Sequence, residues 1–368
     1  MKIREVVDYL NSQFLPVYQE SYDNAGFLIG DADMEITGVL VTLDVTSAVI
    51  DEAIATKANL IVSHHPMIFG GMKRITKDSL SGEMVIRLLQ HGISVYSAHT
   101  NLDNLDWGVN GILGQKLGMT DCKILRPIEG VLCKLVTFVS SSHAEELRRS
   151  LFAVGAGTIG NYDCCSFNSE GTGTFRASEG CNPFCGEIGE LHREPETRIE
   201  VIYEKRLEHK LIERLLEVHP YEEPAYDIVQ LSNKYLRIGS GMIGCLERPT
   251  SLMDFLSFVK SVLNIPVIRC SRLDDNMRAK QIQRIATCGG AGSFLIGDAK
   301  AKGADVFLTG DLKYHDFQSA ENRIILCDIG HFESEQFAKD IFYNVISKKF
   351  SNFACRIAEQ SKGYISYI

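Results

Sequence analysis

The sequence lacks the excess of basic residues that binding to nucleic acid usually requires. Its 368 residues include 38 Lys and Arg against 47 Asp and Glu, which gives a formal net charge of −9 at pH 7. Proteins that bind phosphate backbones rely on clustered Lys and Arg side chains that release counterions. We therefore do not expect nucleic acid to be a partner of this protein.

Two further features are absent: an apolar stretch long enough to cross a membrane, and a cysteine pair with the C-x-x-C spacing of structural zinc sites. The first residues carry charges within their apolar pattern, without a small-residue cleavage site.

Most of the 11 cysteines lie in or beside apolar runs, where a free thiol packs as a small hydrophobe. We expect a cytoplasmic protein without a membrane partner, and no metal at the closer-spaced cysteines, Cys164, Cys165, Cys181 and Cys185.

The chain does contain a repeated alternation of strands and helices. A strand, a helix and a second strand between residues 36 and 64 form a β-α-β unit, which predicts parallel strands joined by a right-handed crossover. The pattern continues to residue 99 and resumes in the last third of the chain. We therefore expect an α/β fold with a two-part, three-layer α/β/α core, formed by residues 1–126 and 236–368.

Residues 127–235 have a different pattern, which predicts an inserted domain. We expect a strand at 131–139, a helix at 143–154, a Gly/Ser-rich pair of strands across 164–176, and then a strand, a helix and a strand up to residue 231. Apart from the extra strand of that pair, this is the β-α-β-β-α-β order of a ferredoxin-like α+β domain, which can close a core of its own.

Two adjacent histidines, His64 and His65, end the apolar strand that begins at Asn59, and Pro66 stops that strand. The carboxyl ends of strands are where open α/β sheets bind ligands. An isolated His-His pair is more often one core and one surface residue, so the pair alone does not predict a site.

Three more residues follow apolar strands in the same way. Asp103 follows the strand at 94–99, and His331 and Glu335 follow the strand that ends at Asp328. His331 and Glu335 are four residues apart at a helix start, so they share one helix face. Asp103 alone could be a helix cap, and His331 with Glu335 a solvated pair.

Together, His64, His65, Asp103, His331 and Glu335 form a mixed set of nitrogen and oxygen ligands. Such a set suits zinc, manganese, iron or cobalt, and five side chains exceed what one catalytic ion normally takes. We therefore expect two divalent metal ions per chain, with zinc preferred, sharing a bridging carboxylate. Such a pair can lower the pKa of a water and hold it against an electrophile.

A strand also leads into the glycines of the segment 288–292, and a helix follows. Free backbone N–H groups at that helix start could hold an anion such as a phosphate. Tight packing between strand and helix explains the glycines about as well, and both readings stay open.

These motifs resemble the Nif-three-like family, whose members are often labelled GTP cyclohydrolase type II homologues, and in particular its long bacterial form with a central insert. The resemblance covers essentially the whole chain and rests on six motifs: Tyr22–Gly26, Ser63–Pro66, His99–Asp103, Cys288–Gly292, Thr309–Asp311 with His315, and Gly330–His331 with Ser334–Glu335. It implies that residues 127–235 form a CutA/PII-like domain and that the chain assembles into a toroidal homohexamer.

The resemblance also implies roles for the five ligands. His64 and His331 would serve one ion, His65 and Asp103 the other, and Glu335 would bridge them. A metal-dependent hydrolase of a nucleotide or related heterocycle would use them to activate water, with His99 or His315 moving protons or orienting a ligand. The alternative is a non-catalytic metal-binding assembly, which could be a metallochaperone or a regulatory scaffold. Polar residues around the ligands, such as Asp23 and Asp311, favour catalysis.

Overall fold

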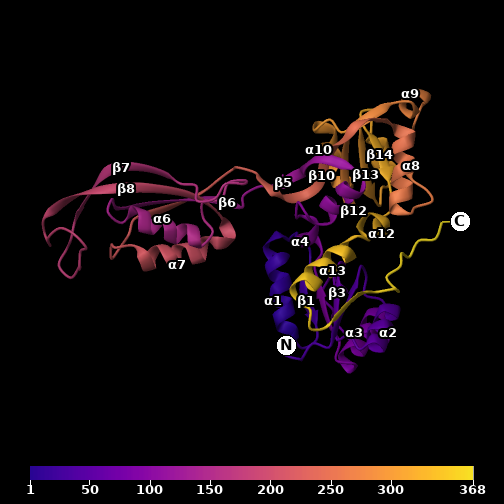
Figure 1. Ribbon diagram of the computed structural model, residues 1–368, viewed down its shortest axis with the longest axis horizontal. Helices are drawn as coiled ribbons and strands as arrows, with labels where there is room; N and C mark the ends of the chain where they lie inside the picture. The colour runs from indigo at the N-terminus through magenta and orange to yellow at the C-terminus, as the bar shows by residue number, and fades with distance from the viewer. Residues whose placement is uncertain (368) are drawn as a thin grey trace. The chain divides into compact units, whose positions relative to one another are not determined.

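The computed structural model describes residues 1–367, which divide into two compact units (Figure 1). One unit combines Met1–Arg126 with the chain from Arg237 onwards, and the other comprises Pro127–Leu236. The expected α/β fold class with an inserted ferredoxin-like domain is confirmed.

The N-terminal part of the first unit is built on a five-stranded sheet of order β1-β4-β3-β2-β15. Strands β4, β3, β2 and β15 are parallel, and β1 pairs with β4 in the antiparallel direction. The strands span Gly26–Ile29 (β1), Gly38–Thr42 (β2), Leu60–Ser63 (β3), Ser94–Ser97 (β4) and Ala354–Ile357 (β15). The last strand comes from the C-terminal end of the chain, so the two ends of the sequence share one sheet.

Helices cover this sheet because consecutive strand residues are apolar on both faces. Leu40 and Ile61 pack against α2 (Ser47–Thr56) and α3 (Leu80–Gln90) in one buried cluster. Helices α1 (Ile3–Gln13) and α13 (Ala338–Lys349) also belong to this part, where Phe14, directly after α1, and Phe342 of α13 meet edge to face with ring centroids 5.4 Å apart. All four residues of β3 are buried, which leaves the segment after Ser63 as the first that can reach a site.

The C-terminal part of the same unit is built on a six-stranded sheet of order β11-β14-β13-β12-β10-β5. Its central strands β12, β13 and β14 are parallel, whereas β10 pairs antiparallel with β12 and β11 antiparallel with β14. The strands span Met119–Ile128 (β5), Tyr235–Ser251 (β10), Arg269–Cys270 (β11), Gln281–Ala291 (β12), Val306–Gly310 (β13) and Ile325–Asp328 (β14).

Side chains that alternate along these strands enter two separate clusters. Val306 and Leu308 pack with α8 (Leu252–Leu263), while Phe307 packs with α10 (Ile296–Ala301). The shorter helices of this unit are α4 (Thr100–Asp103), α5 (Val109–Lys116), α9 (Asp275–Arg278), α11 (Tyr314–Gln318), α12 (His331–Glu335) and the 3₁₀ turns Pro16–Tyr18 and Ser293–Leu295.

The inserted unit is a four-stranded antiparallel sheet of order β7-β8-β6-β9 with two helices. Its elements are β6 (Leu132–Ser140), α6 (Ala144–Ala153), β7 (Phe167–Arg176), β8 (Leu191–Glu204), the 3₁₀ turn Lys205–Leu207, α7 (Glu208–Val218) and β9 (Tyr226–Gln230). Leu147 and Leu151 of α6 and Leu211 and Leu215 of α7 close one buried cluster against the sheet.

One expected element of this unit is wrong. The sequence predicts a pair of strands across 164–176, but the structure has the single strand β7 there. Cys164 lies before it in a left-handed turn, with φ 52°. Gly171 and Gly173 do not break this strand, and they pair with Glu196 and Glu194 of β8.

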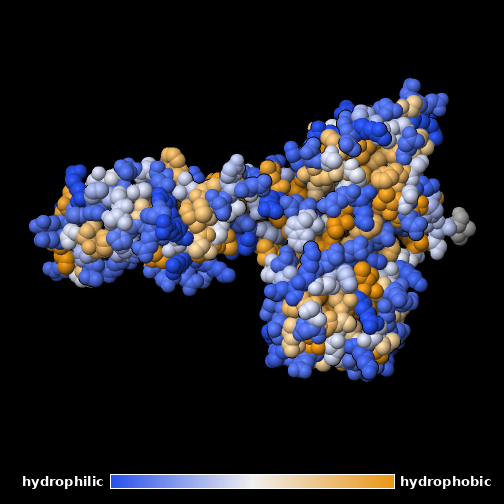
Figure 2. Space-filling view, viewed as in Figure 1, coloured by the Kyte–Doolittle hydropathy of each residue, from blue (hydrophilic) through white to orange (hydrophobic). Residues whose placement is uncertain are grey.

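On the face shown in Figure 2, hydrophilic residues cover much of each unit, with apolar patches between them. Among residues 1–367 no helix is both long enough and apolar enough to cross a bilayer.

Candidate metal centre

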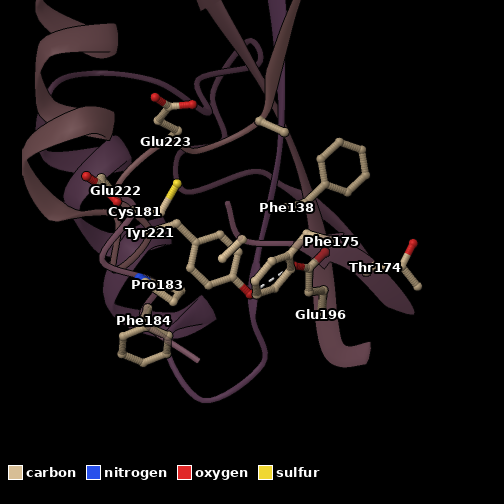
Figure 3. A pocket seen from close by; sticks show the side chains of 13 residues that line it. Phe138, Thr174, Phe175, Cys181, Pro183, Phe184, Glu196, Tyr221, Glu222 and Glu223 are labelled. Carbon is tan, nitrogen blue, oxygen red and sulfur yellow. Dashed lines mark hydrogen bonds between the residues drawn. The ribbon is translucent and has the colours of Figure 1, made fainter. Parts of the chain in front are cut away.

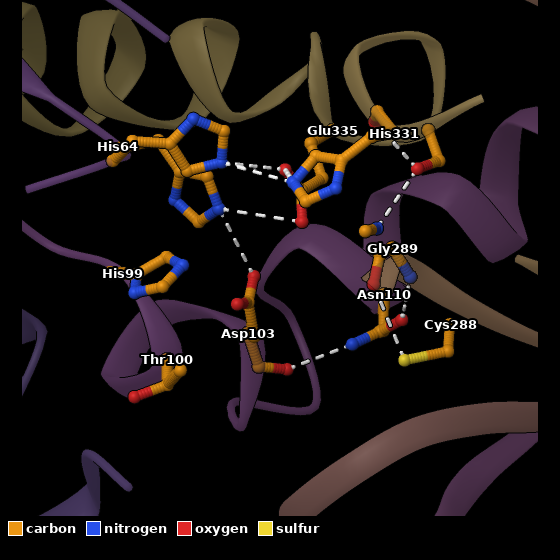
Figure 4. Close-up of polar contacts among 12 residues, drawn as sticks. His64, His99, Thr100, Asp103, Asn110, Cys288, Gly289, His331 and Glu335 are labelled. Carbon is orange, nitrogen blue, oxygen red and sulfur yellow. Dashed lines mark hydrogen bonds and ion pairs between the residues drawn. The ribbon is translucent and has the colours of Figure 1, made fainter. Parts of the chain in front are cut away.

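The five ligands expected from the sequence meet at one place in the first unit (Figure 4). His64 and His65 follow the carboxyl end of β3, and Asp103 ends α4, which follows β4. His331 and Glu335 are the first and last residues of α12, after β14. Parallel strands from both parts of this unit therefore bring their carboxyl ends to a common point.

Glu335 lies at the centre of the group. Its Oε2 lies 2.9 Å from Nε2 of His65 and 3.1 Å from Nε2 of His331. Its Oε1 lies 3.9 Å from Nε2 of His64, which is itself 3.4 Å from Oδ1 of Asp103. The two oxygens of one buried carboxylate thus face two different sets of ligands.

Each imidazole is oriented by an acceptor at its other nitrogen. Nδ1 of His64 lies 2.9 Å from the carbonyl oxygen of Ala98, and Nδ1 of His65 lies 2.7 Å from Oδ1 of Asp44. Nδ1 of His331 lies 2.7 Å from Oδ2 of Asp311. Such partners fix the ring and leave Nε2 for a metal ion.

The charges of the group favour a cation. Burial raises the pKa of Asp103 to about 6. Burial alone would lower the pKa of His65, but hydrogen bonds to Asp44 and Glu335 raise it to about 10. The hydrogen bond to Glu335 raises the pKa of His331 to about 9. Burial would raise the pKa of Glu335, yet its hydrogen bonds to the imidazoles hold it well below the ordinary value. A divalent ion would replace the protons on these rings.

Two observations show that the group fits a metal ion. Nε2 of His64 and Oδ1 of Asp103 are buried without a hydrogen-bond partner, which is costly unless a ligand is bound. Gly290, with φ +59°, lies so close to the site that a Cβ atom there would come within 2.2 Å of Oε1 of Glu335. The backbone at Gly290 therefore has no room for a side chain beside this carboxylate.

The geometry groups the ligands differently from the pairing that the resemblance implies. The atoms of His65, His331 and Glu335 lie within 4.8 Å of one another, as do those of His64, Asp103 and Glu335. His64 thus lies with Asp103, and His331 with His65. The reason is the position of His331 on the first turn of α12, where its Nε2 lies 3.4 Å from Nε2 of His65.

The two histidines expected to act on protons differ in their position. His99 lies in a third group with His64 and His65, and its Nδ1 lies 2.9 Å from Oδ1 of Asp23. Burial would raise the pKa of Asp23, but hydrogen bonds from His99 and Thr100 lower it to about 2. His315 is exposed on α11, beside Gln318, and belongs to none of the metal-ligand groups found among residues 1–367.

A cavity of about 230 Å³ opens beside the ligands. His99, Asp103, His331 and Glu335 line it, and Tyr22 and Phe294 supply aromatic rings. This volume lies below the range of about 300–1,000 Å³ typical of pockets that hold a drug-sized ligand. It therefore suits one ring or small polar group, while the rest of a larger ligand stays outside.

Sequence reasoning missed Asp44, although the rule that found the other residues also applies to it. Asp44 lies two residues beyond the carboxyl end of β2, the neighbour of β3. The glycine segment at 288–292 has a structural explanation: Gly290 and Gly292 accommodate the close approach of Glu335 and Thr309. The negative charge of Glu335 beside this backbone opposes an anion site there.

The comparison with protein families agrees with these motifs. The family model described as Duf34/NIF3 (NGG1p interacting factor 3) matches residues 1–362. A Bacillus subtilis (strain 168) protein named GTP cyclohydrolase 1 type 2 homolog is 41% identical over 308 residues, which cover 83% of this chain and 82% of that protein. A Mycobacterium tuberculosis (strain ATCC 25618 / H37Rv) protein of the same name is 33% identical, over 91% of this chain and 88% of its own length.

Solved structures show the same fold over the whole chain. A Bacillus cereus protein described as related to NIF3 superposes with a TM-score of 0.85 at 34% identity, covering 100% of this chain and 99% of that one. A Staphylococcus aureus protein does so with a TM-score of 0.81 at 30% identity, with the same coverage.

Proposed function

Because the chain belongs to the Duf34/NIF3 family, we propose that its core binds two divalent metal ions, zinc by preference, and hydrolyses a nucleotide or a related heterocycle. The observation that carries this proposal is the position of Glu335 between two ligand sets. His65 and His331 would hold one ion with Oε2, and His64 and Asp103 the other with Oε1. Manganese, iron or cobalt would suit the same donors.

Bound there, two divalent ions would supply the Lewis-acid chemistry that activates water and polarises an electrophilic carbon. The protein's own groups would do the rest. His99 lies beside His64 and His65 and lines the cavity, so it is placed to take up or return a proton. Asp23 fixes the ring of His99 through Nδ1, which leaves Nε2 for this task.

The cavity sets limits on the substrate. Its aromatic residues, Tyr22 and Phe294, would contact a flat ring, and its volume of about 230 Å³ admits a heterocycle more readily than a whole nucleotide. The relatives are named GTP cyclohydrolase 1 type 2 homolog, and the GTP in that name gives a starting point for a substrate panel.

The test is turnover of GTP and a small panel of nucleotides by protein reconstituted with zinc, manganese or iron and analysed for metal. The control variant is Asp103→Ala, which removes one ligand. Product formed by the wild type and lost in the variant would support a metal-dependent hydrolase. No product from fully metallated protein would contradict catalysis on this panel and favour a non-catalytic metal-binding assembly.

From the family resemblance we also propose that the chain forms a closed homohexamer. Light scattering coupled to size-exclusion chromatography should then give six times the 41.0 kDa mass of one chain. A monomer or dimer at every concentration tested would contradict this assembly.

A further inference from the structure

A second group of metal-ligating side chains lies in the inserted unit. Atoms of Cys185, His192 and Glu194 lie within 4.8 Å of one another. His192 and Glu194 are two residues apart on β8, so their side chains point to the same face of the sheet. Cys185 comes from the segment between β7 and β8, which folds back over that face.

Backbone contacts hold this segment in place. Its ends pair through the bridge between Ala177 and Ile188, and the backbone N–H of Gly189 donates to the carbonyl oxygen of Ala177 at 2.8 Å. Gly186 lies directly over His192, because a Cβ atom at Gly186 would come within 2.8 Å of the Cβ of His192. The residue after Cys185 is therefore packed on the histidine.

The carboxylate of the group is also oriented. Oε2 of Glu194 lies 3.0 Å from Nε2 of His192, and its Oε1 accepts a hydrogen bond of 2.9 Å from the hydroxyl of Ser140 on the neighbouring strand β6. Burial and the charge of Glu194 raise the pKa of Cys185. A thiolate beside a carboxylate is unfavourable by itself, and a bound cation would offset that repulsion.

A pocket of about 370 Å³, whose lining is shown in Figure 3, adjoins this group through Phe184, the residue before Cys185. Phe175 packs against the ring of His192 with centroids 5.3 Å apart and also lines the pocket. Glu196, two residues beyond Glu194 on β8, lines it as well and accepts a hydrogen bond of 2.8 Å from the hydroxyl of Tyr221. The lining is aromatic and acidic, so a cation at its edge would be favoured electrostatically.

We infer that Cys185, His192 and Glu194 form a metal site of the inserted unit that binds a divalent ion of the zinc class. Sulfur, nitrogen and oxygen donors together match zinc and cobalt, whereas calcium and magnesium prefer oxygen alone. Three protein ligands leave one position of a tetrahedral ion open to water or to a small ligand.

The test is titration of the metal-free, full-length protein with Co²⁺, followed by absorption spectroscopy. A cysteine ligand gives a strong thiolate-to-cobalt charge-transfer band in the near ultraviolet, which histidine and carboxylate ligands do not give. The band should appear in the wild type and disappear in Cys185→Ser, a substitution that changes little besides the ligand atom. His192→Gln should weaken cobalt binding at this site at least about tenfold.

Two variants serve as controls. Cys164→Ser changes an exposed cysteine of the same unit, and Cys288→Ser changes the cysteine that lines the cavity of the core. Both should keep the band. A wild-type protein without the band would overturn the inference, and so would a band that survives in Cys185→Ser or is lost in Cys288→Ser.

Discussion

The two candidate metal groups of this protein differ in how firmly the fold holds their ligands. In the core, Glu335 is 3% exposed and His64 is fully buried, and each of three imidazoles has an acceptor at Nδ1. In the inserted unit, Cys185, His192 and Glu194 are all partly exposed, and Ser140 orients only the carboxylate. We expect the core to hold its ions tightly and the inserted unit to exchange its ion more readily.

The largest expected effect is that of Glu335→Ala. Because Glu335 faces both ligand sets, its removal should abolish both core ions, whereas Asp103→Ala should remove chiefly one. Metal analysis after reconstitution measures both variants. The charge-transfer band of Cys185 in the cobalt protein should remain in Glu335→Ala.

A matched pair of histidine variants controls for this prediction. His331→Ala should lower the metal content of the core, and His315→Ala should leave it unchanged, since His315 is exposed on α11. Equal metal content in wild type, Glu335→Ala and His331→Ala would contradict the assignment of the core ligands.

The next effect concerns the residues that orient the ligands. Asp44→Asn removes the carboxylate that holds Nδ1 of His65 and should weaken metal binding in the core about 10–100-fold. Ser140→Ala should weaken cobalt binding by the inserted unit in the same range, without effect on the core. Competition with a chromophoric chelator measures both. If metal affinity is unchanged in both variants, the contacts of Asp44 and Ser140 do not determine how tightly the two groups bind their ions.

A smaller effect is expected for the backbone of the core site. Gly290→Ala places a Cβ against Glu335 and forces a non-glycine residue to φ +59°, which alone costs about 1–2 kcal/mol of stability. Denaturant unfolding should show this loss, and metal affinity should fall with it. Gly297→Ala in α10 is the control, because a Cβ there meets no atom within 4 Å. Equal stability of the two variants would argue against close packing at Gly290.

The smallest effect is a pH dependence of the inserted unit. Burial lowers the pKa of His219 below its ordinary value of 6.5. As the pH falls, His219 is therefore protonated in the unfolded chain before it is protonated in the folded one. The contribution of His219 to the free energy of unfolding is full above pH 6.5 and declines as the pH falls below that value. Hydrogen exchange of peptides from residues 127–236, compared between about pH 8 and about pH 5, should show the decline.

His219→Gln should remove this part of the pH dependence, whereas His209→Gln should not, because the side chain of His209 is 93% exposed. An identical pH profile in wild type and His219→Gln would show that His219 does not couple to the stability of the unit.

Much of the core group could be predicted because one rule applies to its candidate ligands. His64, Asp103 and His331 each lie just beyond a buried, apolar strand, which is visible in the sequence. Asp44 was missed although it also follows such a strand. Which of these side chains lie nearest one another could not be predicted, because this depends on how α12 turns His331 toward His65.

Other parts of the structure leave a weaker signal in the sequence. Strand β10 was not predicted, since Gly239, Gly241, Gly244 and Pro249 interrupt its apolar pattern. The sequence predicted no metal at the closer-spaced cysteines because they lack C-x-x-C spacing, whereas the group in the inserted unit contains a single cysteine, Cys185. Its three ligands are of three residue types, and the fold of the segment before β8 brings Cys185 to the other two.

Electron paramagnetic resonance of the Mn²⁺-reconstituted protein can test whether Glu335 joins two ions in the core. Two ions that share a carboxylate couple magnetically, so at saturating Mn²⁺ we expect the broadened spectrum of an exchange-coupled pair. This spectrum should give way to that of a single ion in Asp103→Ala. If the saturated wild-type protein shows only the six-line spectrum of isolated Mn²⁺, Glu335 does not bridge two ions.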